Sequence, residues 1–249
     1  MLCPDGQSPI SGESTDMLRL RTFGGLTLAR GEEDLTGAAT QRRRLAILTL
    51  LAVSRDAGMS RDKLQAYLWP DSDAERARHV LNQLLYAQRR HVGPGNLFSG
   101  RKTLRLNREV IWTDVGFFDD ALDRGLREEA LEVYRGPFLD GFFLGEVAEF
   151  DRWVETHRER LSRRAIDAAK GLARQALAAD DHHQAATWWQ RATDLDPLDA
   201  SVMLGLVKAL ADGGDRPGAI RRAQKYQDTL QAEIGVAPDP ELAAFVKGL

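Results

Sequence analysis

The chain has 249 residues, enough for one or two domains, each with a core of its own. Hydrophobic residues make up 43% of it and charged residues 29%, a composition that excludes disordered and fibrous proteins. The longest apolar run, residues 45–53, is too short to cross a bilayer, and no signal peptide is recognisable, so we expect a cytoplasmic protein with no membrane partner. The single cysteine, Cys3, excludes disulfide scaffolds and cysteine-based zinc sites.

The net charge of −3 conceals two parts of opposite sign. Residues 17–114 carry 17 Lys and Arg against 10 Asp and Glu, whereas residues 115–249 carry 17 against 24, giving net charges of +7 and −7. Such a split suggests a module that binds a polyanion, joined to one that avoids it. Chance clustering of solvated charges is the alternative.

The N-terminal region is expected to contain a leader and a small sheet. Residues 1–16 are rich in turn formers and have no apolar period, which predicts a disordered leader. Alternating apolar residues over 18–22 and 26–28, on either side of Gly24-Gly25, predict a β-hairpin. Residues 35–36 are expected to add a short third strand.

Two helices are expected next. Residues 41–53 have helical apolar spacing, and the first turn carries Arg42, Arg43 and Arg44. Cations at a helix N-terminus oppose the helix dipole, so three together favour an anion bound from outside; a solvated helix start is the alternative. Ser60 is expected to cap a short second helix that ends before Pro70.

A third helix is expected over residues 75–92, opened by a capping box between Ser72 and Glu75. Its apolar stripe comprises Ala77, Val80, Leu81, Leu84 and Leu85. The opposite face comprises Arg78, His79, Asn82, Gln83, Tyr86, Arg89 and Arg90. This face carries no carboxylate, and its groups are those that pair with phosphates and base edges. A charged surface helix is the alternative, but such helices usually include Glu or Asp for ion pairs.

A hairpin with a basic tip is expected after the third helix. Residues 97–98 and 104–106 have strand character and flank Arg101 and Lys102, and residues 110–112 are expected to form a returning strand. Strands, three helices and a basic hairpin follow the order of a winged helix-turn-helix, whose third helix enters the major groove of DNA. We therefore predict a DNA-binding domain over residues 17–114.

Residues 115–249 have helical spacing throughout and contain an internal repeat. At an offset of 34 residues, Gly171 falls on Gly205, and the same offset relates Leu172 to Leu206, Asp181 to Asp215 and Ala185 to Ala219. This is the period of tetratricopeptide repeats, which are helix pairs. The predicted fold is therefore mainly α with a small β-sheet and a wing: a winged helix-turn-helix followed by an all-α tetratricopeptide-like domain.

Four stretches over residues 18–249 resemble the Streptomyces antibiotic regulatory protein (SARP) family of bacterial transcriptional activators. LWPD (68–71) with ARHVLNQLLYAQRR (77–90) is similar to the helix-turn-helix of the family, and LFSGRKTLRLNREVIWTDV (97–115) to its wing and exit strand. YRGPFLDGF (134–142) and EIGVAPDPELAAF (233–245) are similar to landmarks of the bacterial transcriptional activator domain, expected over residues 115–249.

The resemblance implies binding to promoter DNA, commonly by two protomers on direct repeats, and recruitment of RNA polymerase holoenzyme to genes of secondary metabolism. The chain departs from the family at Ala87-Gln88, where many members have an Arg-Leu pair. This difference removes one basic group and places an amide on or beside the apolar stripe. Larger relatives append further modules, so the chain is either a short regulator or part of a longer one.

No catalytic, cofactor-binding or metal-binding constellation is recognisable in the sequence. The histidines lack the spacing of a helical metal site, and the nucleophile elbow, the HExxH motif and the phosphate-binding glycine loop are all missing from the sequence. We therefore expect neither an enzyme nor a resident cofactor.

The sequence thus favours a DNA-binding activator. The residues expected to contact base edges are Arg78, His79, Asn82, Gln83 and Tyr86. The residues expected to bind phosphates are Arg42, Arg43, Arg44, Arg89, Arg90, Arg101 and Lys102. The alternative is a protein-interaction adaptor, in which the helical half binds a partner peptide and the winged helix binds no DNA. The helical half could pair protomers, contact polymerase or receive a signal.

Overall fold

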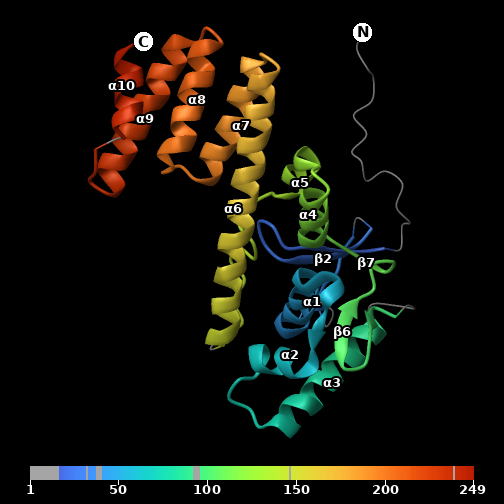
Figure 1. The fold of residues 1–249 in the computed structure, drawn as a ribbon. Helices are drawn as coiled ribbons and strands as arrows, with labels where there is room; N and C mark the ends of the chain where they lie inside the picture. The colour runs from blue at the N-terminus through green and yellow to red at the C-terminus, as the bar shows by residue number, and fades with distance from the viewer. Residues whose placement is uncertain (1–16, 32, 38–40, 92–95, 146, 238) are drawn as a thin grey trace, which may run out of the picture. The chain divides into compact units, whose positions relative to one another are not determined.

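The computed structural model describes residues 17–31, 33–37, 41–91, 96–145, 147–237 and 239–249 (Figure 1). Its fold is mainly helical with two small sheets, which confirms the fold class predicted from the sequence. The leader expected at residues 1–16 lies outside the described residues. Among the described residues, none of the helices combines the length and the apolar character that a membrane span requires.

The described chain divides into two compact units. The first comprises the described residues up to Asp120 together with Val133–Arg158. The second comprises Ala121–Glu132 and Glu159–Leu249. Each unit is described by itself below.

A four-stranded sheet opens the first unit, in the spatial order β3 (Glu33–Asp34), β2 (Thr27–Arg30), β1 (Leu18–Arg21) and β7 (Ile111–Thr113). The expected hairpin is confirmed, because β1 and β2 are antiparallel, with Leu20 opposite Leu28. The third strand forms two residues earlier than expected. The returning strand β7 pairs in parallel with β1, with Leu18 opposite Ile111, and thereby joins this sheet rather than the wing.

Three helices follow: α1 (Arg42–Ser54), α2 (Arg61–Leu68) and α3 (Ala74–His91), with the short 3-10 helix η2 (Arg55–Ala57) after α1. Ser60 caps α2 as expected, since its hydroxyl accepts a hydrogen bond from the Lys63 N–H. The expected capping box at Ser72 is wrong. Asp73 Oδ1 accepts hydrogen bonds from the Glu75 and Arg76 N–H groups instead, because α3 begins one residue earlier than predicted and a carboxylate is an equally good cap.

The wing is a second sheet, in the order β4 (Met59–Ser60), β6 (Thr103–Leu106) and β5 (Phe98–Ser99). Strands β5 and β6 form an antiparallel hairpin, with Phe98 opposite Leu106. Strand β4, which directly precedes α2, pairs with β6 and attaches the wing to the helices.

A buried carboxylate marks the end of β7 and the start of α4 (Asp114–Asp123). Asp114 is 4% exposed, and its oxygens accept hydrogen bonds from the N–H groups of Thr22, Phe23 and Val115 and from the Thr22 hydroxyl. Burial raises the pKa of this carboxyl above its ordinary value, although the hydrogen bonds act to lower it. An aromatic cluster of Phe23, Phe118, Tyr134 and Phe138 packs nearby.

The remaining helices are α5 (Arg127–Val133), α6 (Ala148–Ala178), α7 (His182–Leu195), α8 (Ala200–Asp212), α9 (Arg216–Glu233) and α10 (Pro240–Lys247). The last four lie in the second unit as neighbouring antiparallel rods (Figure 1). The repeat appears in their caps: Asp181 Oδ1 accepts from the Gln184 N–H and Asp215 Oδ1 from the Gly218 N–H, both over 2.9 Å. Ala185 and Ala219, the next equivalent pair, are fully buried. Trp189 in α7 is buried as well, with 6% of its surface exposed.

Candidate nucleic-acid interface

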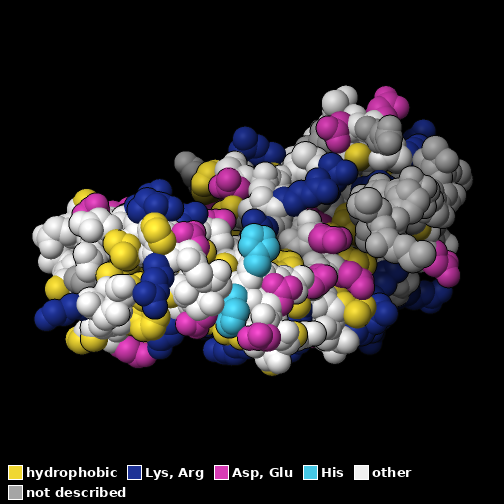
Figure 2. Space-filling view, turned by 90° about the horizontal axis from the view of Figure 1, so that it is seen from above, with side chains coloured by type: hydrophobic (Ala, Val, Ile, Leu, Met, Phe, Trp, Pro, Cys, Tyr) yellow, Lys and Arg dark blue, Asp and Glu magenta, His cyan; other side chains and the backbone are white. Residues whose placement is uncertain are grey.

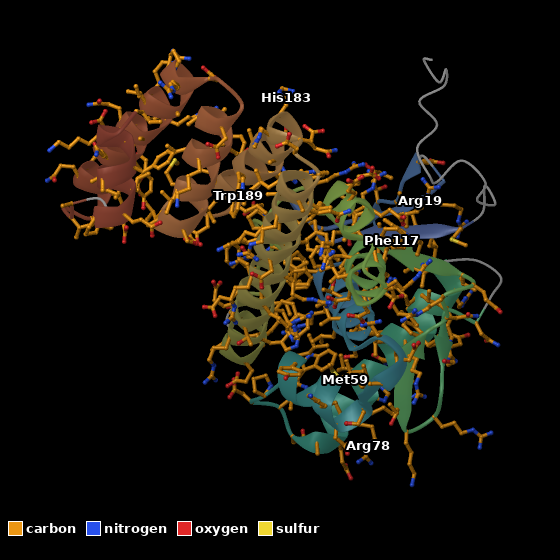
Figure 3. The ribbon with its side chains drawn as sticks, turned by 45° about the horizontal axis from the view of Figure 1, so that its top comes forward. Arg19, Met59, Arg78, Phe117, His183 and Trp189 are labelled. Carbon is orange, nitrogen blue, oxygen red and sulfur yellow. The ribbon has the colours of Figure 1, made fainter. Side chains whose placement is uncertain are left out.

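Helix α3 has one buried face and one exposed face, as the sequence predicts. Ala77, Leu81 and Leu85 are buried in the first unit. All seven polar residues of the opposite face are exposed: Arg78, His79, Asn82, Gln83, Tyr86, Arg89 and Arg90. Tyr86 is the most exposed large hydrophobic side chain of the described residues, at 64%. Figure 3 shows Arg78 on the outer side of the helix, away from the body of the unit.

Two hydrogen bonds order side chains on this exposed face. His79 Nε2 and Gln83 Nε2, one helical turn apart, are 2.8 Å from each other and share a hydrogen bond. Asn82 Oδ1 accepts a hydrogen bond of 2.7 Å from Arg61 Nη1, at the start of α2. The polar groups of α3 are therefore partly oriented before any ligand binds.

The tip of the wing lies beside the start of α2. Arg101 and Lys102 are exposed, as a phosphate-binding role requires. Arg61 Nε donates to the Arg101 carbonyl over 2.8 Å, and the Arg61 N–H donates to the Lys102 carbonyl over 3.3 Å. The tip turns at Gly100, where φ is +85° and a Cβ would lie 2.0 Å from the Thr103 carbonyl oxygen, so glycine is required there.

The cations at the base of the wing are engaged by neighbouring groups of the first unit. Arg105 Nε donates to the Asp56 carbonyl, and Arg108 forms ion pairs with Asp120 over 2.8 Å and with Asp56 over 3.3 Å. Arg108 remains 47% exposed, but its charge is paired with these two carboxylates.

The three arginines at the start of α1 do not act as one cluster. Arg42 Nη1 donates to the Phe143 carbonyl over 2.9 Å, and the Arg43 guanidinium lies over the Trp69 ring, 5.6 Å from its centroid; both side chains are exposed. Arg44 is only 8% exposed. The expectation that Arg44 binds phosphate is corrected here, because the buried stretch of α1 begins at this residue and encloses its side chain.

Sequence reasoning missed Arg61 and Lys63. Both belong to the first turn of α2, and the Lys63 ammonium lies 5.9 Å from the centroid of the Tyr67 ring. The sequence signal that could have identified them is their position directly after the Ser60 cap. The residues just before them, Met59–Ser60, form strand β4, which pairs with the wing. The nearest carboxylates, on Asp62, Asp73 and Glu75, lie at the N-terminal ends of α2 and α3, before the exposed basic face begins.

The second unit presents a different surface. On its side seen in Figure 2, Lys and Arg, Asp and Glu, and hydrophobic side chains alternate without a region of one sign. His182 Nε2 lies 3.1 Å from Asp180 Oδ1. Across the described ranges of the chain, no group of three or more His, Cys, Asp or Glu side chains is arranged to hold a metal ion.

Comparisons with known proteins agree with this architecture. The family model of the bacterial transcriptional activator domain matches residues 119–248. A Rhodococcus erythropolis relative, described as an uncharacterized 47.3 kDa protein in the thcA 5′ region, is 31% identical over 201 residues, which cover 80% of this chain and 43% of the relative. The solved structure of Mycobacterium tuberculosis EmbR in complex with a low affinity phosphopeptide matches with a TM-score of 0.64 and 20% identity, covering 92% of this chain and 64% of that one.

The chain thus spans less than half of the Rhodococcus relative and less than two thirds of the EmbR chain. At 20% identity the likeness to EmbR establishes a shared fold. The family match extends over more than half of this chain and confirms the resemblance drawn from its sequence motifs. The chain belongs to the bacterial transcriptional activator domain family.

Proposed function

We propose that this chain is a transcriptional regulator of the SARP type that binds promoter DNA in a sequence-specific manner, with α3 in the major groove and the wing tip against the phosphate backbone. The observation that carries the proposal is the exposed face of α3, which has no carboxylate from residue 76 to residue 91 and lies next to the exposed cations of the wing. An α-helix fits the major groove, and amide and guanidinium groups pair there with base edges.

The roles of the residues follow from their positions. Those proposed to contact bases are Arg78, His79, Asn82, Gln83 and Tyr86, all exposed on α3. Those proposed to bind phosphates are Arg42, Arg43, Arg89, Arg90, Arg101 and Lys102. Arg44 is omitted because it is buried. Residues 17–114 form the DNA-binding domain in this proposal and residues 115–249 the activator domain.

The acidic domain is proposed to act on proteins rather than on DNA. Its net charge of −7 opposes contact with phosphates, which leaves its surface available to a second protomer or to RNA polymerase holoenzyme. Binding of two protomers to direct repeats, recruitment of the holoenzyme, control of secondary-metabolite genes and residence in the cytoplasm on the nucleoid rest on the SARP resemblance.

An in vitro selection tests the proposal. The purified 249-residue chain is incubated with a pool of random duplexes, the bound fraction is sequenced after several rounds, and the winning duplex is titrated at several salt concentrations. We expect spaced direct repeats and a steep fall of affinity with salt, because several phosphate contacts release counterions. Survivors identical to the input pool, bound more weakly than about 10⁻⁶ M, would refute specific binding and favour the adaptor alternative.

A further inference from the structure

We propose that Arg61 is a specificity-determining residue of this DNA interface: it holds the side-chain amide of Asn82 in the orientation that favours guanine over adenine. The inference rests on the proposed DNA binding. It concerns a residue outside α3, at the first position of α2.

The first step is the geometry of Arg61, which joins three elements. Its Nη1 donates to Asn82 Oδ1 on α3 over 2.7 Å, and its Nε donates to the Arg101 carbonyl at the wing tip over 2.8 Å. Its backbone N–H donates to the carbonyl of Lys102. One side chain therefore connects the helix proposed to contact bases with the loop proposed to contact phosphates.

The second step is the polarity of the bond between Arg61 and Asn82. A guanidinium group donates hydrogen bonds and accepts none, so the amide atom that faces it has to be the oxygen. The Nδ2 group of Asn82, with two hydrogens to donate, then lies on the other side of the amide. Because the donor is charged, this bond is stronger than one between neutral groups.

The third step is the effect on base recognition. An asparagine that pairs with adenine uses both amide atoms, donating to N7 and accepting from the N6 amino group. In this chain the Asn82 oxygen is turned toward Arg61 and one of its two lone pairs is occupied, so the Nδ2 donor on the opposite side is the part offered to DNA. Guanine presents two acceptors, O6 and N7, in the major groove, and the Arg61 charge further favours that edge. We therefore expect guanine at the base contacted by Asn82.

The fourth step separates the geometry of Arg61 from its charge. Lysine preserves the positive charge but has one terminal nitrogen, so it cannot reproduce the two directed donors that engage Asn82 and Arg101. Arg61→Lys should therefore loosen the orientation of the Asn82 amide without changing the net charge of the interface. Arg76→Lys is a matched control, because Arg76 is an exposed arginine in the first turn of α3 that has no role in the proposed interface.

The experiment compares the wild-type 249-residue chain, Arg61→Lys, Asn82→Ala, their double variant and Arg76→Lys. Each is titrated with the selected operator and with its single-base variants at two salt concentrations, and each is unfolded thermally to verify its fold. We expect Arg61→Lys to lose about tenfold of the guanine-over-adenine preference at one base pair, the same base pair at which Asn82→Ala loses its preference. The salt dependence should be unchanged, and the double variant should behave like Asn82→Ala.

Two results would overturn this inference and leave the proposed DNA binding standing. In one, Arg61→Lys binds all operators more weakly by the same factor and retains the base preference. In the other, the losses of the two single variants multiply in the double variant, so that the residues act independently. If the wild-type chain has no base preference at all, the proposed DNA-binding function itself is wrong, and this inference fails with it.

Discussion

Thr22 Oγ1 donates a hydrogen bond of 2.7 Å to Asp114 Oδ1, although 92 positions separate the two residues. The same carboxylate accepts from the N–H groups of Thr22, Phe23 and Val115, so four donors surround one buried side chain. The pair connects the first strand of the sheet to the start of α4. An unpaired carboxylate in this place would carry a large desolvation cost, which the four donors offset in part.

Replacing Asp114 by asparagine should destabilise the protein. The amide retains one acceptor oxygen, but its NH2 group would face N–H donors that then lose their acceptor. We expect Asp114→Asn to lower the free energy of unfolding by about 3 kcal/mol, measured by urea unfolding at neutral pH. Asp140→Asn, at an exposed position, is the control. Equal stability of the two variants would contradict this account of Asp114.

The stability of α3 should rise when Gln88 is made apolar. Gln88 is 2% exposed, and neither of its amide atoms has a hydrogen-bond partner within the described part of the chain. We expect Gln88→Leu to raise the free energy of unfolding by about 1–2 kcal/mol, because the buried amide is removed. Gln83→Leu, on the exposed face of the same helix, should leave stability nearly unchanged and impair DNA binding. A loss of stability in Gln88→Leu would show that the amide is satisfied in solution.

The two faces of α3 illustrate what sequence patterns can predict. The spacing of Ala77, Leu81 and Leu85 identified both faces of α3, because helical periodicity is a local property. Burial of Arg44 was missed, since the charge pattern of one turn does not reveal what packs against it. The parallel pairing of β7 with β1 and the bridge from Arg61 to Asn82 were missed as well. Both join segments far apart in the chain, and no local spacing encodes such contacts.

Two glycines at equivalent positions of the repeat should respond differently to replacement by alanine. A Cβ on Gly205 would lie 2.6 Å from two ring atoms of Trp189, a buried indole that cannot move aside. A Cβ on Gly171, the equivalent residue, would meet the flexible end of Arg127 at 2.9 Å. We expect Gly205→Ala to lower the free energy of unfolding by about 1–3 kcal/mol and Gly171→Ala to leave it unchanged or raise it by up to about 1 kcal/mol.

The measurement is urea unfolding of both glycine variants, followed by circular dichroism. Combining Gly205→Ala with Trp189→Leu tests the cause, because a smaller side chain at residue 189 makes room for the new methyl group. The cost of Gly205→Ala should therefore be smaller in the Trp189→Leu background than in the wild type. An equal cost in both backgrounds would exclude the clash as its origin.

The pH dependence of stability should reveal the ion pair between Lys170 and Asp199. Their charged atoms lie 3.2 Å apart, and Asp199 also caps α8. Burial raises the pKa of Asp199. Hydrogen bonds from Ser201 and Lys170, together with the Lys170 charge, lower it by more, so the pKa lies below its ordinary value. The carboxylate therefore contributes stability above pH of about 4, which is lost as the pH falls through the folded-state pKa.

Asp199→Asn keeps a side chain that caps helices well but removes the charge. We expect it to lower the free energy of unfolding at pH 7 by about 1 kcal/mol. The gap between the variant and the wild type should close as the pH falls below the ordinary aspartate range. Asp212→Asn, at an exposed position of α8, is the control and should show no such convergence. A gap that stays constant with pH would assign the effect to capping alone.

Two variants of the proposed interface should differ in how they lose DNA affinity. Arg101 is an exposed cation at the wing tip, so Arg101→Ala should weaken binding to all duplexes alike and reduce the salt slope by about one unit. Asn82→Ala removes a group proposed to contact a base, and it should cost about 1–3 kcal/mol on the selected operator only. Binding titrations of both variants against operator and random duplex, at several salt concentrations, separate the two effects. Equal losses of Asn82→Ala on operator and random DNA would assign Asn82 to the backbone, and a salt slope unchanged by Arg101→Ala would remove Arg101 from the phosphate contacts.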